Sequence, residues 1–398
     1  MKKIIFLIFF ILIINNRYGK YFISLKNQTS QYSSEFYKDI KDKKKALRKG
    51  RKYFQKCLDD ILINKQYFKK NINPLVSVVI PVYSAQSKIR KSIRSIQNQN
   101  MIDLEIILVD DFSNDNSINI IKSLQEKDER IILIKNKKNR GIFYTRCIGT
   151  LKARGKYIFP LDNDDLFFDE EVIDIIVKEA NKGNYDIVEF NYAEYYNLIV
   201  PPNKFVSTEF GNHTHNLVLK QPELAQFPRK KNNTYGVFDC FLWAKCIKAK
   251  IYKKSINKIG KEIYSKFILR GEDFIMTFVL FRIAKSFKFF GKYGIFRYKS
   301  LSTATFQSSR ELYLLSRIIY LDVIIKFTEN NYRDKLYVAY FAEIFLKTLS
   351  NELDEINVQD KIYFKKVLRK LLKNKYIDNN YKTIFISYFK NFSWVFSK

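Results

Sequence analysis

Short apolar runs alternate with segments of helical periodicity between residues 75 and 190. The apolar runs predict buried strands, and the segments between them repeat apolar residues at spacings of three and four, as amphipathic helices do. The predicted strands are residues 75–80, 104–109, 131–134, 157–161 and 185–190, and the predicted helices are residues 86–98, 117–127, 142–153 and 169–182. Strands that alternate with helices are typical of right-handed crossovers. We therefore predict an α/β fold built on a mainly parallel sheet, with helices on both faces.

The beginning of the chain carries a different pattern. Met-Lys-Lys precedes an unbroken apolar run from Ile4 to Ile14, and together they predict a secretory signal peptide over residues 1–20. At about 1.5 Å per residue, the run is shorter than a hydrocarbon core of about 30 Å. No small-residue cleavage site follows, so a short uncleaved signal anchor stays open. Residues 21–73 predict a basic helical stem, which ends before Pro74 because the residue preceding a proline disfavours helix.

The C-terminal region, residues 306–398, is helical by pattern. Its predicted helices are residues 311–328, 335–352 and 360–374. The segment from Lys361 to Lys375 is amphipathic and cationic, so peripheral contact with a membrane surface is one hypothesis. Packing against the α/β part of the chain is the commoner outcome for such helices.

Polar clusters follow three of the predicted strands. Pro81-Val82-Tyr83 come after the first strand, Asp110 to Asp115 after the second, and Asp162-Asn163-Asp164-Asp165 after the fourth. Because the carboxyl ends of parallel strands meet at one edge of a sheet, these clusters predict one shared ligand site.

The acidic run, residues 162–165, is the clearest candidate for chemistry. Residues i and i+2 of an extended chain point the same way, so Asp162 and Asp164 can face one ligand. Neighbouring carboxylates repel one another unless a cation compensates them, and a divalent ion shared with substrate phosphates is the simplest compensation. Asp165 suits the turn into the next helix. For such a run taken alone, a solvated acidic turn is the alternative.

Composition changes this picture little. Lys and Arg number 71 against 40 Asp and Glu, a net charge of +31 that would suit nucleic acid or an anionic membrane. The basic residues are spread along the whole chain, and the sequence contains no nucleic-acid-binding motif that we recognise. We therefore predict no nucleic-acid partner.

Cysteine and histidine add little further chemistry. The four cysteines have no CxxC spacing, which argues against zinc and thiol redox chemistry, and a Cys240–Cys246 disulfide stays open. The only two histidines, His213 and His215, suit a solvated loop better than a metal site. Glycosylation signals that permit a lumenal location occur at Asn27, Asn212, Asn232 and Asn391.

These motifs, in this order, resemble a family 2 glycosyltransferase with the GT-A fold over residues 75–300. The resemblance is carried by residues 76–83, 95–99 and 105–111, Arg140-Gly141, Arg146, the acidic run, Trp243-Ala244-Lys245, Gly271-Glu272-Asp273 and Tyr298. It implies a catalytic domain over residues 74–305, with a nucleotide-sugar half (74–191) and an acceptor half (192–305). Three positions depart from the family pattern: Ser84 and Cys147 stand where Asn is usual, and Phe112 where a small, glycine-like residue is usual.

The resemblance also implies roles for residues on the donor side. Asp111 would accept a base N–H, which favours uracil, and Asp162 would contact the ribose and the sugar. Further donor contacts would come from Pro81, Val82, Tyr83 and Arg146. Asp164, together with Asp162, would bind Mn²⁺ or Mg²⁺ at the donor diphosphate.

On the acceptor side, Asp273 resembles the general base of the family, with Glu272 as the fallback. Taken alone, both carboxylates would equally suit the N-terminus of a helix. Trp243 and Lys245 resemble an element that precedes a helix in relatives, with a structural role first and acceptor contact second. Three tyrosines could stack on sugars or pack in the core: Tyr192, Tyr195 and Tyr196.

The resemblance implies a metal-dependent, inverting glycosyltransferase of the hexosyltransferase type. It would move a sugar from a nucleotide-sugar donor, with a UDP-sugar favoured, to a hydroxyl of a glycan, protein or lipid. The alternative is a catalytically inactive relative that serves as a binding or scaffold protein. The N-terminal signal favours the secretory pathway (an ER or Golgi lumen, or a membrane) over the cytoplasm.

Overall fold

The computed structural model describes residues 45–46, 48–57, 72–196, 206–208, 217–221, 230–231, 234–235, 241–268, 271–299, 310–328, 342–343, 346–347, 350, 357–374, 379–389 and 395. The chain divides into two units, residues 1–51 and 52–398, and the sheet with the helices that cover it belongs to the second. The N-terminal signal, His213, His215 and Cys240 lie outside the described residues, whereas Cys246 carries a free, buried thiol.

Four parallel strands form the first half of a ten-stranded sheet, in the order β3-β2-β1-β4. They are β1 (Val76–Val82), β2 (Leu104–Asp110), β3 (Ile131–Lys135) and β4 (Tyr157–Pro160). Every residue of β1 and β2 is buried, as expected for parallel strands covered on both faces. The predicted strands and their parallel arrangement are confirmed here.

The second half of the sheet is mixed. The predicted fifth strand is present as β6 (Ile187–Tyr196), but it does not pair with β4. Instead β11 (Lys245–Lys248) lies between them, antiparallel to both, and β12 (Ser286–Lys299) pairs in parallel with β6. Shorter strands complete the sheet and a separate hairpin: β5 (Leu166–Phe167), β7 (Val206–Thr208), β8 (Val218–Lys220), β9 (Lys230–Lys231) and β10 (Thr234–Tyr235).

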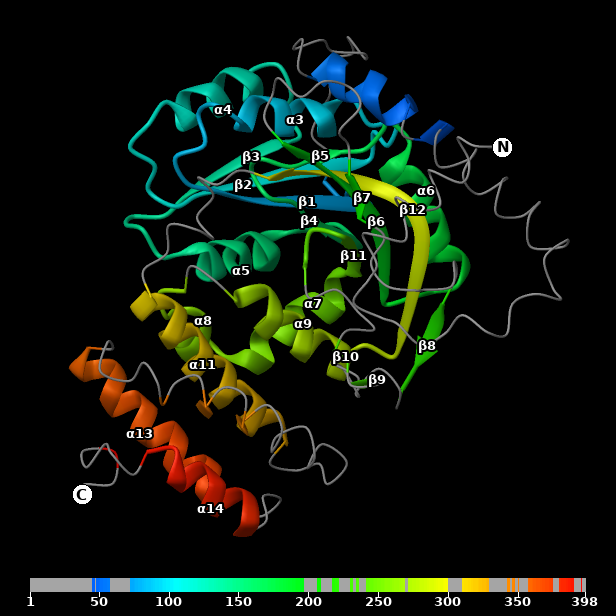
Figure 1. Ribbon diagram of the computed structural model, residues 1–398. Coiled ribbons are helices and arrows are strands. Elements are labelled where there is room, and N and C mark those ends of the chain that lie inside the picture. The colour runs from blue at the N-terminus through cyan, green and yellow to red at the C-terminus, as the bar shows by residue number, and fades with distance from the viewer. Residues whose placement is uncertain are drawn as a thin grey trace, which may run out of the picture. The chain divides into compact units, whose positions relative to one another are not determined.

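Helices cover both faces of the sheet, as predicted. Figure 1 shows α3 (Ile89–Gln97) and α4 (Ser117–Gln125) on one face, and α5 (Ile142–Lys152) and α7 (Ala249–Ile259) on the other. The helix α6 (Val172–Lys182) packs against β6, β11 and β12. Two further helices are α8 (Lys261–Tyr264) and α9 (Glu272–Ile283), and α9 packs on α7.

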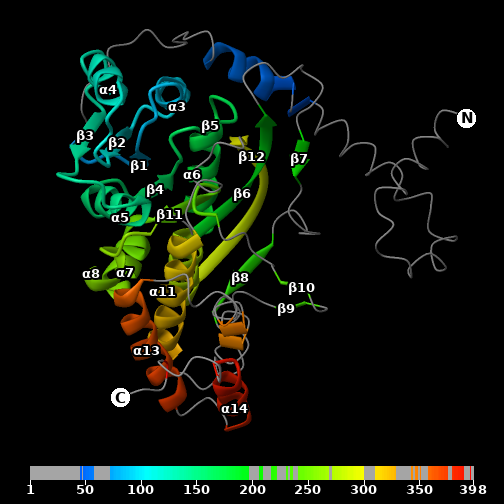
Figure 2. The same ribbon diagram turned by 60° about the vertical axis from the view of Figure 1, so that its left-hand side comes forward.

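The described C-terminal helices extend the hydrophobic core. They are α11 (Arg310–Thr328), α13 (Val358–Lys373) and α14 (Asn379–Ser387). The helix α11 packs against both α9 and α13, and Figure 2 shows α13 beside α11. The buried Asp322 carboxylate of α11 accepts hydrogen bonds from the Tyr363 hydroxyl and the Lys370 ammonium, both at 2.7 Å. The predicted packing of these helices is confirmed. The predicted helix 335–352 falls mostly outside the described residues.

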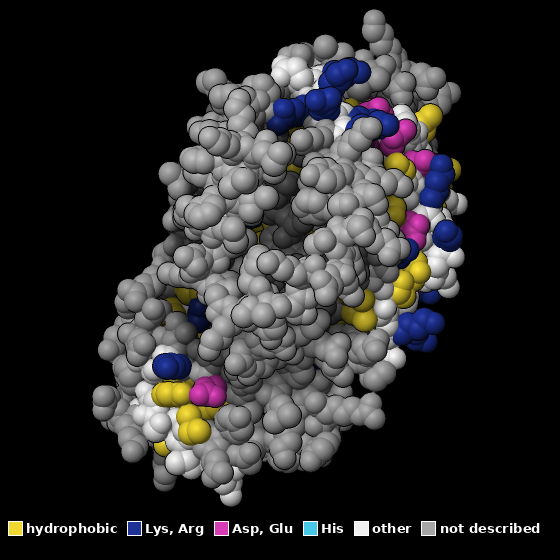
Figure 3. Space-filling view, turned by 45° about the vertical axis from the view of Figure 1, so that its right-hand side comes forward, with side chains coloured by type: hydrophobic (Ala, Val, Ile, Leu, Met, Phe, Trp, Pro, Cys, Tyr) yellow, Lys and Arg dark blue, Asp and Glu magenta, His cyan; other side chains and the backbone are white. Residues whose placement is uncertain are grey.

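The described surface mixes charge signs. On the face shown in Figure 3, the described Lys and Arg side chains are interspersed with acidic and hydrophobic side chains. Among the described helices, none combines the length and apolar character that a membrane crossing requires.

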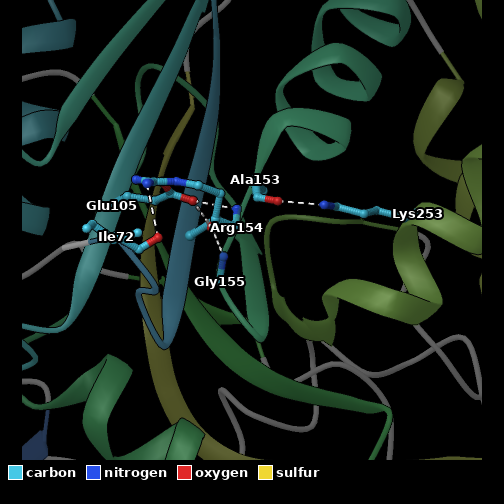
Figure 4. A network of polar contacts seen from close by, with 7 residues as sticks. Ile72, Glu105, Ala153, Arg154, Gly155 and Lys253 are labelled. Atoms are coloured by element: carbon cyan, nitrogen blue, oxygen red, sulfur yellow. Dashed lines mark hydrogen bonds and ion pairs between the residues drawn. The ribbon is translucent and has the colours of Figure 1, made fainter. Parts of the chain in front are cut away.

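One buried carboxylate ties together the strand ends that lie opposite the predicted site (Figure 4). Glu105 of β2 accepts hydrogen bonds from the Ser77 hydroxyl of β1 at 2.6 Å and from the Arg154 Nη2 at 2.7 Å. It also accepts bonds from the Arg154 backbone N–H and Nε, at 2.6 and 2.9 Å. A side chain at Gly155 would lie 2.6 Å from the Ser77 backbone nitrogen, so only glycine allows this close approach.

Replacing this carboxylate should destabilise the fold. Glu105→Ala removes the acceptor of the buried Ser77 hydroxyl and the carboxylate partner of the Arg154 guanidinium, so we expect the free energy of unfolding to fall by about 3 kcal/mol. Urea denaturation followed by circular dichroism measures it. Asp174→Ala is the control, because it removes a partly exposed i,i+4 partner of the exposed Lys178 and should change stability by less than about 0.5 kcal/mol. Equal losses in the two variants would contradict the role given to Glu105.

Candidate active site

Arg146 joins three segments that are far apart in the sequence. Its guanidinium, on α5, is buried, and its Nη2 lies 2.5 Å from Asp162 Oδ1, just after β4. Its Nη1 lies 2.8 Å from Glu272 Oε1 and 2.6 Å from Asp273 Oδ1, at the start of α9. Two of the predicted donor residues, Arg146 and Asp162, are therefore held in one cluster with both candidate bases.

The electrostatics of this cluster follow from three carboxylates facing one cation. Burial, with the neighbouring Asp273, raises the pKa of Glu272 to about 8. Burial also raises the pKa of Asp273, against the opposing effect of Arg146. Burial alone would lower the pKa of Arg146, but the three carboxylates outweigh it and hold that pKa well above its usual value. Arg146 is thus a permanent cation, and Glu272 binds a proton readily at neutral pH.

The two carboxylates of α9 differ in access. The side chain of Glu272 is 8% exposed and that of Asp273 is 18% exposed. Both stand in the first turn, where the helix dipole favours negative charge, and Gly271 before them takes a left-handed backbone. Asp273 is therefore the more accessible of the two acidic groups.

The three aspartates of the acidic run contact different partners. The side chains of Asp162 and Asp164 are 30% and 19% exposed, whereas Asp165 is buried. The Asp165 backbone N–H closes a turn onto the Asp162 carbonyl, but this turn leads into β5 and not, as predicted, into a helix. The Asp165 carboxylate accepts a hydrogen bond from the Tyr298 backbone N–H of β12 at 2.8 Å. Burial and the neighbouring Asp162 raise the pKa of Asp164. The Lys88 ammonium lies 3.3 Å from the Asp164 Oδ2.

These residues fit a divalent cation only in part. Two oxygen-donor side chains, both partly exposed and close enough to repel each other, suit Mg²⁺ or Mn²⁺ when substrate phosphates complete the shell. Within the described ranges, no three His, Cys, Asp or Glu side chains are arranged to hold an ion by themselves.

Asp111 has a structural role that sequence reasoning missed. Its buried carboxylate accepts hydrogen bonds from the Asn136 side chain at 2.7 Å and from the backbone N–H groups of Arg140 and Gly141, both at 2.8 Å. Gly141 permits this turn because its φ is +83° and a side chain would meet the Ile268 carbonyl at 2.9 Å. A carboxylate has about four acceptor positions, so the predicted contact with a base would use the one that is left.

Pro81 and Val82, the last two residues of β1, and Tyr83 after them have different exposures. The Pro81 carbonyl accepts a hydrogen bond from the Asn163 side chain at 3.1 Å, and the Val82 carbonyl accepts one from the Asp111 N–H at 2.8 Å. Tyr83, at 51% exposed, presents its ring to solvent at this edge. Pro81 and Val82 therefore hold the edge together, and Tyr83 is available to a ligand.

Two of the three departures from the family pattern coincide with left-handed backbone. Ser84 has φ 47° and Phe112 has φ 69°. Asparagine and glycine tolerate this conformation better than serine or phenylalanine. The usual family residues at these positions thus have a conformational reason. The third departure, Cys147, is buried in the hydrophobic core and does not line the site.

Two of the predicted acceptor-side aromatic residues pack inward. Tyr192 and Trp243 are each 2% exposed and form an edge-to-face pair with ring centroids 4.6 Å apart. Lys245 is buried and pairs with Glu189 at 3.0 Å. The side chains of Tyr195 and Tyr196 lie outside the described residues.

The chain is similar to known glycosyltransferases. Residues 77–254 match the family described as Glycosyl transferase family 2. An uncharacterized glycosyltransferase of Haemophilus influenzae is 32% identical over 180 residues, which cover 42% of this chain and 72% of that protein. The GalNAc(5)-diNAcBac-PP-undecaprenol beta-1,3-glucosyltransferase of Campylobacter jejuni is 28% identical over 292 residues, which cover 68% of this chain and 84% of that protein.

Solved structures of S. aureus TarS share the fold. The complex of its residues 1–349 with UDP has a TM-score of 0.54 and 14% identity, covering 79% of this chain and 86% of that one. The complex with UDP-GlcNAc has a TM-score of 0.55 and 13% identity, covering 78% and 83%. This likeness confirms the predicted GT-A-like α/β architecture.

Relief of the backbone strain at Phe112 should stabilise the protein. We expect Phe112→Gly to raise the free energy of unfolding by about 1 kcal/mol, because glycine adopts the left-handed backbone without the steric cost. Phe112→Ala is the matched control, since it removes the ring but keeps the Cβ. Urea denaturation of both variants separates strain from ring contacts. A gain in the alanine variant equal to that in the glycine variant would contradict backbone strain as the cause.

Glu272 should make stability depend on pH. Its folded pKa of about 8 lies above its unfolded value, so its contribution is complete below the unfolded pKa and is lost as pH rises through the folded pKa. We expect Glu272→Gln to gain roughly 3 kcal/mol relative to the wild type between pH 5.5 and 8.5. Chemical denaturation across this range measures the difference. Glu126→Gln, an exposed control, should follow the wild type. Parallel curves for the wild type and Glu272→Gln would refute the assignment.

Proposed function

This chain belongs to glycosyl transferase family 2, and from that premise we propose that it is a metal-dependent, inverting enzyme that moves a sugar from a nucleotide-sugar donor to an acceptor hydroxyl. The observation that carries the proposal is the Arg146 cluster. It joins a carboxylate of the acidic run, Asp162, to the candidate base, Asp273, with Arg146 contacts of 2.5 and 2.6 Å. Binding and proton transfer would therefore take place side by side.

A UDP-sugar is the donor that we favour. The TarS structures, which share the fold, were solved with UDP and UDP-GlcNAc. In this chain, the exposed Tyr83 ring and the remaining acceptor position of Asp111 would receive the base. Asp162 would contact the ribose and the sugar. These contacts would select the nucleotide. Residues of the acceptor half would select the sugar.

The chemical step would be a direct displacement. The acceptor oxygen forms a bond to the anomeric carbon while the bond between that carbon and the diphosphate oxygen breaks, and the hydroxyl proton passes to a carboxylate base. Asp273 suits this role better than Glu272, because its side chain is more exposed and Glu272 already holds a proton near neutral pH. Arg146 would keep the Asp273 carboxylate oriented between donor and acceptor.

Mn²⁺ or Mg²⁺ would be held by Asp164 and Asp162 together with the donor diphosphate. When bound, such an ion neutralises the charge that develops on the leaving diphosphate. The support is the pair of partly exposed carboxylates at the end of β4.

The acceptor class that we would test first is a lipid-linked glycan. The name of the Campylobacter relative gives an undecaprenol-linked acceptor. A location at a membrane also agrees with the N-terminal apolar run and with α13, where Val358 and Ile362 are 73% and 64% exposed beside several lysines. Membrane or secretory localisation rests on residues 1–20 and stays a prediction, as do the domain boundaries.

Loss of either carboxylate should abolish transfer. We expect Asp273→Asn to lower the transfer rate by about 10²- to 10⁴-fold while donor binding persists, because the base is lost but the amide oxygen can still accept a hydrogen bond from Arg146. Asp164→Ala should lower the rate and remove its dependence on Mn²⁺. The measurement is release of nucleoside diphosphate from a panel of nucleotide sugars with Mn²⁺.

Asp174→Asn, at a partly exposed carboxylate on α6, is the matched control and should retain full activity. Unchanged transfer in both Asp273→Asn and Asp164→Ala would refute the mechanism. An enzyme that binds the donor but neither transfers nor hydrolyses it under any condition would favour the inactive, scaffold alternative.

A further inference from the structure

Lys88 is a cation built into the acidic end of the site. It is the residue before α3, and its ammonium reaches across the sheet edge to the acidic run, 3.3 Å from the Asp164 Oδ2. The same ammonium lies 4.8 Å from the centre of the Tyr298 ring, on β12. Lys88 therefore bridges three segments, and the proposed chemistry assigns it no role.

The position of this ammonium matters because Asp164 is the carboxylate proposed to bind the divalent ion. A lysine ammonium is a compact charge on a flexible stem, so it can compensate a carboxylate in one state and leave it in another. Its side chain is 31% exposed, which leaves room for such a movement. An ammonium and a divalent ion cannot both approach Asp164 closely without repulsion.

From this geometry, we propose that Lys88 is a positioning residue that makes binding of the divalent ion depend on the donor. In the donor-free enzyme, Lys88 compensates Asp164 and weakens its affinity for the ion. When the donor binds, the diphosphate offers the ammonium a second anion, so Lys88 leaves Asp164 and pairs with a phosphate oxygen. The ion and the diphosphate then bind cooperatively, and each raises the affinity for the other. This inference rests on the proposed metal site.

A simple surface ion pair is the competing explanation. Exposed pairs of this kind contribute little to stability, and their loss should not affect metal binding in any donor-dependent way. The two explanations therefore differ in a property that can be measured without turnover.

The test is a titration of the full chain with Mn²⁺, in which free Mn²⁺ is read by electron paramagnetic resonance, with and without UDP. We expect Lys88→Met to bind Mn²⁺ about three- to fivefold more tightly than the wild type without UDP, as loss of a partly exposed competing charge predicts. UDP should tighten Mn²⁺ binding less in this variant than in the wild type. Lys88→Arg, which keeps the charge, should retain the cooperativity at least in part. Lys122→Met removes an exposed charge on α4 and should behave as the wild type.

Asp164→Ala separates the possible failures. If the wild type binds Mn²⁺ and Asp164→Ala does not, the metal site is correct, and a Lys88→Met titration identical to the wild type overturns the Lys88 proposal alone. If Asp164→Ala binds Mn²⁺ as the wild type does, the proposed metal site is wrong and the Lys88 proposal falls with it. Thermal melts of each variant confirm that the folded state is being compared.

Discussion

The buried Arg146 guanidinium is the interaction on which the site depends. A charge removed from water is tolerated only when it is paired and hydrogen-bonded, and Arg146 meets that condition with three carboxylates from two segments. With all groups ionised, these carboxylates exceed the one cation, so burial drives a proton onto Glu272. The cluster thus fixes the start of α9 against the end of β4. Burial of the cluster thus determines the protonation state of Glu272.

The sheet supplies the rigid frame for this cluster. Paired residues Val82 and Asp110 end β1 and β2 at the same level, so the loops that follow emerge side by side. Asp111 then holds the 136–141 turn through three hydrogen bonds, and Asn163 reaches back to the Pro81 carbonyl. At the other end of the same strands, Glu105 binds Ser77 and Arg154. Polar side chains therefore fasten the strands at both ends, while the apolar residues between them form the core.

The first half of the fold could be predicted from the sequence because its elements are encoded locally. Each of β1 to β4 is a short apolar run, and each helix between them shows its own periodicity. The second half could not, because β11 reaches its place between β4 and β6 only through pairing of distant segments. The long strand β12 was missed because its aromatic and basic residues gave no clear alternation. The candidate site residues were identified by motif, but Lys88 belongs to no motif, and its partner lies 76 positions away.

The acidic run shows that residues of one motif can have different roles. Its three aspartates have the same chemistry and nearly the same position, yet their partners lie 16, 76 and 133 residues away, at Arg146, Lys88 and Tyr298. Asp165 is buried on a backbone N–H and therefore serves the fold. Asp162 and Asp164 stay partly exposed, each beside a cation of the protein. A cation that a ligand brings to Asp164 must compete with Lys88. A cation that approaches Asp162 must instead compete with Arg146, which Glu272 and Asp273 hold in place. The tertiary partners of each aspartate thus determine which position a ligand can enter.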